Sequence, residues 1–408
     1  MNESFFYRDG TLWCEGVPLD ALADAVGTPV YVYSVARVLT NIRKLQTAFG
    51  PLGASIHYSL KANANLALLR VINEAGVGVD AVSAGEIARA RLAGIPASRI
   101  VFAGVGKTRA ELEYALDIGV GWINVESQAE LALLETLAAE RRQIVTVALR
   151  LNPGIEAATH RHIATGHAGA KFGIEPAVLA AILDYREAYP HLFIAGIHVH
   201  IGSQLARVDA TLDAMRLAQR LAEPHSDVRT LNIGGGFPVR YGETDNLPEP
   251  ADFARAMKPL LDGWHIMIEP GRAVVADAGL LLVSVLYVKE QYGNRFVITD
   301  GSMTDLLRPA LYGAEHSIIP VREPASDMLP ATVVGPVCES TDVLKSSALL
   351  PPLATADRLA VMDVGAYGMV MASNYNMRMR PPEVLVEGRQ WRVVRRREML
   401  EDLLRLEQ

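Results

Sequence analysis

The sequence predicts an α/β protein built from a (β/α)8 TIM-like barrel and a C-terminal all-β domain. Between about residues 28 and 275, short β-branched runs alternate with longer stretches rich in Ala, Leu, Glu and Arg. Such alternation is typical of a parallel sheet with crossover helices, and eight units over about 250 residues fit a closed barrel. Beyond about residue 276, Pro and Gly separate the apolar runs and helical windows are few. A chain of 408 residues is also too long for one ordinary core, so we expect a second domain.

Eight apolar, β-branched segments are the predicted barrel strands. They are residues 55–60, 78–82, 100–104, 122–126, 146–151, 195–200, 230–234 and 264–269. Helical windows lie between some of them, at 84–94, 110–119 and 127–142. The first window opens after Ser83 with Glu86 three residues later, which predicts a capping box. An open, doubly wound sheet is the alternative arrangement for the same alternation.

The rest of the chain is predicted to form a β-rich domain. Its apolar runs are residues 281–288, 295–299, 331–335, 358–364 and 384–388. Pro and Gly between the runs mark turns, which favours an all-β arrangement. We expect the residues before the barrel to join this domain. The predicted domains are therefore 28–275 for the barrel, and 1–27 with 276–408 for the β-rich part.

Composition and charge favour a soluble, cytoplasmic protein. The formal net charge of −7 argues against a general nucleic-acid or acidic-membrane surface, because both need a basic patch. The longest apolar run, 279–288, is too short to span a bilayer, and the N-terminus lacks a signal pattern. Cys14 and Cys338 have no metal-type spacing, and so few cysteines suggest a reducing compartment.

If the barrel forms, its active site lies at the carboxyl ends of its strands. Charged or glycine-rich segments follow most of the predicted strands. They are Lys61 after the first strand, Asp80 in the second, Arg150 and Asn152 at the fifth, 198–204 at the sixth, 234–237 after the seventh and 269–272 at the eighth. A solvated rim explains some of this pattern, and Lys61 by itself is explained by a strand that has reached solvent. A rim does not require a triple glycine.

The run Gly234-Gly235-Gly236 has two interpretations. Glycines let backbone N–H groups approach an anion closely, and they also form flexible turns. The loops after strands seven and eight are the usual phosphate site of a barrel. The position of the run therefore favours phosphate binding.

Two histidines alternate at the end of the sixth predicted strand. His198 and His200 point to the same side of the strand, so an H-x-H metal site and a metal-dependent hydrolase are competing possibilities. Such a hydrolase needs further ligands at other strand ends, whereas His191 and His265 lie at strand starts. We therefore expect no metal. A packed structural role is expected for His198, and the other use of a histidine here is as a ring stacked on an aromatic cofactor.

Glu269 ends the eighth predicted strand, where a buried carboxylate needs a partner. Arg272 could pair with it, or the carboxylate could face a protonated heterocyclic nitrogen. Lys61, the glycine run and Glu269 together fit pyridoxal 5'-phosphate chemistry. A lysine forms a Schiff base with the aldehyde, the loop holds the phosphate, and the carboxylate keeps the ring nitrogen protonated as an electron sink.

Nine ordered motifs extend this interpretation over nearly the whole chain. They are 27-GTPVYVYS-34, 58-YSLKAN-63, 166-GHAGAKFGI-174, 198-HVHIGSQ-204, 269-EPGR-272, 308-RPALY-312, 335-GPVCESTDVL-344, 365-GAYG-368 and 372-ASNYN-376. On these motifs the chain resembles the pyridoxal-phosphate-dependent group IV decarboxylases, which share the alanine-racemase fold.

The resemblance implies a set of cofactor-binding residues. Lys61 would be the Schiff-base lysine, Asp80 would lie under the ring, His200 would stack on its face, and Glu269 would face the pyridine nitrogen. Phosphate contacts would come from Ser203, the glycine run and Tyr367. The full set is Lys61, Asp80, His200, Ser203, Gly234, Gly235, Gly236, Glu269, Pro270, Gly271, Arg272 and Tyr367.

The resemblance also implies how the substrate is held. Cys338 would reprotonate the carbanion, Glu339 would bind a distal ammonium, and the distal carboxylate would meet two arginines, which suit carboxylates well. The substrate-binding set is Arg272, Arg308, Tyr312, Glu339 and Tyr367. A distal group of this kind is itself an amino acid, as in meso-2,6-diaminopimelate, whose decarboxylation gives L-lysine. Segment 335–340 would reach a neighbouring subunit, which implies a homodimer with shared active sites.

Two other functions remain open. A relative could act on another amino acid, although Arg272, Arg308 and Glu339 together argue against this. A non-catalytic binding protein could keep the same fold, although the presence of both Lys61 and Cys338 argues against that. The long Gly- and Ala-rich stretch 154–173 is a candidate lid.

Overall fold

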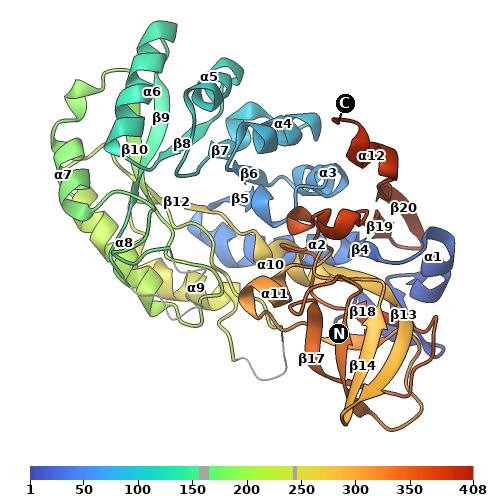
Figure 1. Cartoon of the computed structure of the whole chain (residues 1–408). Helices are drawn as coiled ribbons and strands as arrows, with labels where there is room; N and C mark the ends of the chain where they lie inside the picture. Colours follow the sequence, from blue (N-terminus) through green and yellow to red (C-terminus); the bar gives the residue numbers. More distant parts are fainter. Residues whose placement is uncertain (156–164, 242–245, 408) are drawn as a thin grey trace. The chain divides into compact units, whose positions relative to one another are not determined.

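The computed structural model describes residues 1–155, 165–241 and 246–407. The chain divides into two compact units (Figure 1). The barrel unit comprises Asn41–Val239 and Asn246–Ala273, and the β unit comprises Met1–Thr40, Arg240–Asp245 and Val274–Gln408.

The barrel unit contains a closed barrel of eight parallel strands. Its strands are β5 (Ser55–Ser59), β6 (Gly78–Ala81), β7 (Ile100–Phe102), β8 (Trp122–Val125), β9 (Val145–Leu151), β10 (Leu192–Val199), β11 (Thr230–Asn232) and β12 (His265–Ile268). The barrel closes where β12 pairs with β5, with Met267 opposite Ser55. Each strand overlaps one predicted segment, so the predicted barrel is confirmed and the open sheet is excluded.

Helices follow most of the barrel strands. They are α3 (Leu66–Glu74), α4 (Ala84–Leu92), α5 (Arg109–Ile118), α6 (Gln128–Arg141), α7 (Pro176–Asp184), α8 (Asp209–Ala222), α9 (Pro250–Met257) and α10 (Arg272–Val275), and α2 (Val35–Phe49) precedes the first barrel strand. None of the helices in the described ranges has the length and apolar character to cross a membrane.

The start of α4 agrees only in part with the predicted capping box. Ser83 Oγ accepts a hydrogen bond from the Glu86 backbone N–H at 3.2 Å, so Ser83 is the N-cap. The Glu86 carboxylate, however, accepts from the Val82 backbone N–H at 2.8 Å. A reciprocal capping box occurs one helix later, between Thr108 and Glu111.

The β unit is dominated by antiparallel pairing. Its long sheet has the order β17-β16-β14-β13-β4-β19-β20, with β18 pairing with β13 and β15. These strands are β4 (Val30–Ser34), β13 (Gly279–Gln291), β14 (Asn294–Thr299), β15 (Ile318–Pro320), β16 (Leu329–Val334), β17 (Val343–Leu350), β18 (Arg358–Val361), β19 (Glu383–Glu387) and β20 (Gln390–Arg395). The predicted β-rich character of this part is confirmed.

The N-terminal residues are built into the β unit. A small sheet of β1 (Phe5–Arg8), β2 (Thr11–Cys14) and β3 (Val17–Pro18) precedes helix α1 (Leu19–Val26). Phe5, Leu12 and Leu22 are buried in one apolar cluster with Val32 and Leu282. Burial of such side chains contributes about 1.5–3 kcal/mol each.

Strand β4 lies in a different place from the one expected. The sequence predicts that residues from 28 onward belong to the barrel, but Val30–Ser34 pairs antiparallel with β13 and parallel with β19. All five residues of β4 are buried. An apolar strand gains the same burial in either sheet, so its local sequence does not select one.

Candidate active site

Lys61 is in a short 3-10 turn, Leu60–Ala62, directly after β5. Leu60 and Ala62 are buried and anchor this turn, whereas the Lys61 side chain is exposed. Burial raises the pKa of Asp80 and of Glu86, and the positive charge of Lys61 offsets part of both rises. Burial lowers the pKa of His200, and the charge of Lys61 lowers it further. The amine at the end of this strand is therefore surrounded by ionisable groups rather than by bulk solvent alone.

Asp80 projects from β6 and is only 2% exposed. Ser59 Oγ donates a hydrogen bond of 2.8 Å to Asp80 Oδ2, while Asp80 Oδ1 has no partner among the described residues. Burial, followed by the negative charge of Glu269, raises the pKa of Asp80 to about 8, and the charge of Lys61 offsets part of this rise. A buried carboxyl oxygen without a partner is costly, which points to a ligand atom at this position.

Glu269 follows β12 and is also buried. Asn232 Nδ2 donates to Glu269 Oε1 at 2.6 Å, and Asn124 Nδ2 donates to the same oxygen at 3.0 Å. His198 Nε2 lies 3.3 Å from Glu269 Oε2. Burial by itself would raise the pKa of Glu269, but the charge of His198 and the hydrogen bonds outweigh it and hold the pKa well below its usual range. The charge and the hydrogen bonds around Glu269 therefore favour the ionised form of this buried carboxyl group.

Two asparagines outside the predicted set of site residues orient Glu269. Asn232 Oδ1 accepts from the Gly234 backbone N–H at 3.0 Å, and Asn124 Oδ1 accepts from Trp122 Nε1 at 3.0 Å. The side-chain amide of each asparagine thus forms hydrogen bonds through both its oxygen and its nitrogen. The signal for them was available in principle, because a buried asparagine in a barrel strand must have polar partners. Nothing in the sequence indicates that the partner is Glu269.

His200 follows β10 and contacts the glycine run. The Gly235 backbone N–H donates to His200 Nδ1 at 3.3 Å, so that nitrogen carries no proton. Desolvation, then the positive charges of Lys61 and Arg150, keep the pKa of His200 well below its usual range. His200 is consequently a neutral ring with its Nε2 protonated.

Each glycine of the run is required by close packing. Gly234 has a φ of +64°, and a Cβ there would lie 2.7 Å from His200 Nδ1. A Cβ at Gly235 would lie 2.4 Å from the Glu269 carbonyl oxygen. Gly236 has a φ of +96°, and a Cβ there would lie 2.6 Å from the Gly202 carbonyl oxygen. The run is therefore a compact bend without side chains and not a flexible turn.

Ser203 and Arg272 are joined beside this bend. Arg272 is buried at the start of α10, and its Nε and Nη2 donate to Ser203 Oγ at 3.3 Å and 3.2 Å. The preceding Gly271 packs on the turn that carries the lysine, since a Cβ there would lie 3.1 Å from Ala62 Cβ and from Ser59 Cβ. The 269–272 motif thus connects the carboxylate, the serine and the lysine turn in one unit.

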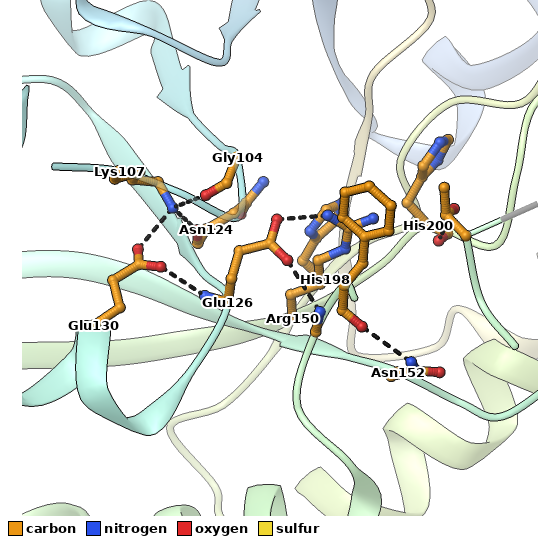
Figure 2. Close-up of polar contacts among 12 residues, drawn as sticks. Gly104, Lys107, Asn124, Glu126, Glu130, Arg150, Asn152, His198 and His200 are labelled. Atoms are coloured by element: carbon orange, nitrogen blue, oxygen red, sulfur yellow. Dashed lines mark hydrogen bonds and ion pairs between the residues drawn. The ribbon is translucent and has the colours of Figure 1, made fainter. Parts of the chain in front are cut away.

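A second polar network supports the ends of the neighbouring strands (Figure 2). Lys107 Nζ donates to Glu130 Oε1 and to the Asn124 carbonyl oxygen, both at 2.6 Å, and to the Gly104 carbonyl oxygen at 2.9 Å. The Lys107 and Glu130 side chains are buried. This network fixes the backbone of Asn124, one of the two asparagines that hold Glu269.

Arg150 belongs to the same region of β9. Its Nη1 donates to Glu126 Oε1 at 2.5 Å, and the Gly173 backbone N–H donates to Glu126 Oε2 at 3.0 Å (Figure 2). The guanidinium carbon of Arg150 lies 4.8 Å from the centre of the Phe172 ring. Arg150 and Glu126 therefore hold residues 172–173, at the end of the candidate lid 154–173. Residues 156–164 of that lid lie outside the described ranges.

The remaining predicted residues belong to the β unit. Arg308 and Tyr312 are one turn apart in α11 (Arg308–Tyr312), so they share a face of that helix. Arg308 is 6% exposed, and its Nη1 lies 2.9 Å from His316 Nε2. Tyr367 has a φ of +56°, a conformation that costs energy for a residue with a side chain.

Cys338 and Glu339 are exposed on a loop of the β unit. The Cys338 backbone N–H donates to Asn376 Oδ1 at 3.1 Å, and the Tyr375 hydroxyl donates to Glu339 Oε2 at 3.0 Å. The hydrogen bond to Glu339 raises the pKa of Tyr375. The 372–376 motif therefore braces the loop that carries the predicted acid.

The histidines do not form a metal centre in the described parts of the chain. No group of three or more His, Cys, Asp or Glu side chains there could hold a metal ion. His198 and His200 instead contact Glu269 and Gly235, respectively.

The chain matches a known family over most of the barrel. Residues 35–276 match the family described as "Pyridoxal-dependent decarboxylase, pyridoxal binding domain". The chain is 42% identical to a diaminopimelate decarboxylase of Pseudomonas aeruginosa over 407 residues, covering 98% of each chain. It is 40% identical to the diaminopimelate decarboxylase of Aquifex aeolicus over 403 residues, covering 97% of this chain and 96% of the relative.

Solved structures give the same result. The diaminopimelate decarboxylase of Helicobacter pylori, complexed with L-lysine, superposes with a TM-score of 0.91 at 39% identity, covering 95% of this chain and 99% of that one. The diaminopimelate decarboxylase of M. jannaschii in co-complex with L-lysine has a TM-score of 0.93 at 33% identity, covering 100% and 98%.

Proposed function

Because the chain belongs to the diaminopimelate decarboxylase family of pyridoxal-dependent decarboxylases, we propose that it decarboxylates meso-2,6-diaminopimelate to L-lysine and carbon dioxide. This carboxy-lyase reaction is the last step of lysine biosynthesis. The observation that carries the proposal is the buried Glu269 side chain held by Asn124 and Asn232, close to the turn that carries Lys61 and to the glycine bend.

The residues present fit pyridoxal 5'-phosphate. When bound, this cofactor supplies an electron sink for the carbanion that decarboxylation leaves. The lowered pKa of Glu269 favours a carboxylate that can keep a heterocyclic nitrogen protonated, and Asp80 Oδ1 has no partner among the described residues. The Gly234–Gly236 bend has no side chains, which lets an anion approach its backbone closely. These features are the chemistry that the cofactor needs from its protein.

Each residue of the predicted cofactor set receives a role in this proposal. Lys61 attaches the cofactor covalently, and His200, neutral and bound to Gly235, presents its ring face. The remaining members contact the ring or the phosphate, namely Asp80, Ser203, Gly234, Gly235, Gly236, Glu269, Pro270, Gly271, Arg272 and Tyr367. The strained backbone of Tyr367 supports a functional role, since such strain is often found at ligand sites.

The proposed substrate contacts combine two arginines with an acidic group. Arg272 and Arg308 bind the distal carboxylate together with Tyr312, and Glu339 binds the distal ammonium. Both arginines are buried, which strengthens charge-assisted hydrogen bonds to a carboxylate. The L-lysine in structures of similar enzymes is the product expected from such a substrate.

We also propose a homodimer in which segment 335–340 completes the partner's active site. Cys338 is to reprotonate the carbanion, and a proton donor of this kind works best away from bulk water. In the single chain, Cys338 and Glu339 are exposed, which supports a role at a surface that another subunit covers. The free thiols of Cys14 and Cys338 are in keeping with a cytoplasmic location.

The first experiment is the visible spectrum of the purified protein, followed by carbon dioxide release from meso-diaminopimelate and from L-lysine in parallel. The proposal predicts a yellow protein that releases carbon dioxide only from diaminopimelate. A yellow protein that is active on neither substrate would contradict the proposed reaction. It would favour a relative acting on another amino acid or a non-catalytic homologue.

A further inference from the structure

Arg308 of the β unit is held by a histidine that the proposed reaction does not use. His316 is 0% exposed, eight residues after Arg308. Its Nε2 lies 2.9 Å from Arg308 Nη1, and its Nδ1 lies 2.9 Å from the Met362 carbonyl oxygen. The histidine thus connects the arginine to the backbone just after strand β18.

These two contacts determine where the ring proton is. A carbonyl oxygen only accepts hydrogen bonds, so His316 Nδ1 must carry the proton and donate to Met362. A guanidinium only donates, so His316 Nε2 must offer its lone pair to Arg308 Nη1. The ring is therefore neutral, with the proton on Nδ1, and it acts as an acceptor for Arg308.

An aromatic ring holds the guanidinium from a second direction. The guanidinium carbon of Arg308 lies 4.7 Å from the centre of the Tyr241 ring. Tyr241 in turn meets His316 edge to face, with the ring centres 5.3 Å apart and the planes at 80°. A free arginine side chain has large rotamer entropy. A guanidinium that Tyr241 and His316 already hold in place loses less of this entropy when it binds a carboxylate.

We propose that His316 is a positioning residue for recognition of the substrate's distal carboxylate. It holds Arg308 in one orientation by accepting from Nη1, and Tyr241 restrains the plane of the same guanidinium. The proposal deepens the proposed function and rests on it, because Arg308 is taken to bind that carboxylate. The ligand class is an amino acid with a free α-carboxylate at the end distal to the reacting centre.

Two substitutions at His316 test the roles of its two ring nitrogens separately. His316→Asn keeps a donor near the Met362 carbonyl but removes the acceptor that Arg308 uses. His316→Gln places a carbonyl oxygen near the position of Nε2 and can restore that acceptor. The readout is the dissociation constant of L-lysine from the cofactor-loaded protein, measured by titration calorimetry.

His316→Asn is expected to weaken L-lysine binding by about 10-fold or more, the effect of one hydrogen bond to a charged group. His316→Gln is expected to stay within about 3-fold of the original protein, as partial rescue of the same bond. With diaminopimelate, His316→Asn should raise KM more than it lowers kcat, because the bond serves binding rather than chemistry.

The chain offers a matched control. His225 of the barrel unit is also buried and lies beside an arginine, with Nδ1 2.9 Å from Arg186 Nη1. His225→Asn should leave L-lysine binding unchanged. In an Arg308→Met background, His316→Asn should cause no further loss, since its effect passes through Arg308.

Three results would overturn the inference. The first is a folded His316→Asn protein that binds L-lysine as tightly as the original. The second is an undiminished loss from His316→Asn in the Arg308→Met background. The third is an original protein that neither binds L-lysine nor decarboxylates diaminopimelate, which would overturn the proposed function as well. If His316→Asn does not fold, Tyr241→Leu tests the second restraint on Arg308 by the same titration, and unchanged binding there would contradict the proposal.

Discussion

The predicted cofactor-facing residues of the barrel unit differ sharply from the predicted acid loop of the β unit. Asp80 and Glu269 are buried, and Glu269 receives hydrogen bonds from side chains on two other strands. Cys338 and Glu339 are exposed and are braced by neighbours in the 372–376 motif.

This difference shows which of the predicted site residues already lie in a buried, hydrogen-bonded network within one chain and which do not. Charges in a buried network are oriented before any ligand arrives, and such preorganisation strengthens their action on a bound group. An exposed thiol and carboxylate are surrounded by water and gain strength only when something covers them. The buried network around Glu269 is thus complete within one folded chain, whereas the Cys338 loop is exposed in the single chain, as the proposed homodimer would require.

The largest expected effect is at the barrel end. Lys61→Ala should abolish the covalently bound cofactor, with its visible absorbance, and lower kcat by roughly 10⁴-fold, because the covalent anchor is lost. The measurement is the visible absorbance spectrum of the native protein after filtration, with borohydride reduction before denaturation to trap any covalently attached cofactor. Lys44→Ala, at an exposed position of α2, is the control and should remain yellow. Retention of covalent cofactor in Lys61→Ala would refute the assignment.

The next effect tests the exposed loop. Cys338→Ala should keep the cofactor spectrum but lower kcat by about 10²- to 10⁴-fold, the usual contribution of a positioned acid. Cys14→Ala is the matched control, because Cys14 is the other cysteine and is buried in the β unit. Unchanged turnover of Cys338→Ala would remove the thiol from the mechanism.

Mixing the two inactive variants distinguishes a shared site from one built by a single chain. If Lys61 and Cys338 of different subunits form one site, Lys61→Ala and Cys338→Ala proteins should recover about a quarter of the original activity after subunit exchange, since half of the dimers are mixed. No recovery in a mixture shown to contain mixed dimers would mean that both groups come from one chain.

A smaller effect concerns the asparagines that hold Glu269. Asn232→Ala removes a 2.6 Å hydrogen bond to the carboxylate. Its loss should raise the pKa of Glu269 and weaken cofactor affinity by about 10- to 100-fold, as for a hydrogen bond to a charged group. The measurement is reconstitution of the cofactor-free protein. Asn41→Ala, another buried asparagine, controls for the loss of an amide. If Asn232→Ala binds the cofactor as tightly as the original protein, the hydrogen bond from Asn232 to Glu269 is not needed for cofactor binding.

The smallest effect is a pH dependence of stability in the cofactor-free protein. The pKa of Asp80 is raised to about 8, and that of Asp363 in the β unit to about 7, in both cases chiefly by burial. A raised pKa means that the folded state holds the proton more tightly. This stabilisation is present in full below the unfolded pKa near 4 and is lost as pH rises through the folded pKa, by at most about 1.4 kcal/mol per pH unit and group.

Denaturant unfolding between pH 5 and 9 checks this sign. Asp80→Asn should flatten the decline in stability up to about pH 8, and Asp363→Asn should flatten it up to about pH 7. A decline that neither substitution alters would show that these carboxyls titrate normally.

The barrel was predictable because its signals are local. Each strand is a short apolar run, several connections contain a helical window, and the barrel places the residues after its strands at one end. The positions of Lys61, Asp80, His200, the glycine run and Glu269 after or within strands therefore make them candidate site residues. The wrong placement of Val30–Ser34 has the opposite cause, because its partners β13 and β19 lie about 250 and 350 residues away.

The sequence by itself determined the elements, their order and the chemical types at the strand ends, since these depend on neighbouring residues and on periodicity. Only the tertiary structure decided which groups form hydrogen bonds with one another and which charges lie close enough to shift a pKa. Glu269 is 37 residues from Asn232 and 145 from Asn124, and the neutral form of His316 depends on Met362, 46 residues further on. Hydrogen bonds at such separations leave no periodic trace, and a pKa depends on burial and charge, which exist only once the chain has folded.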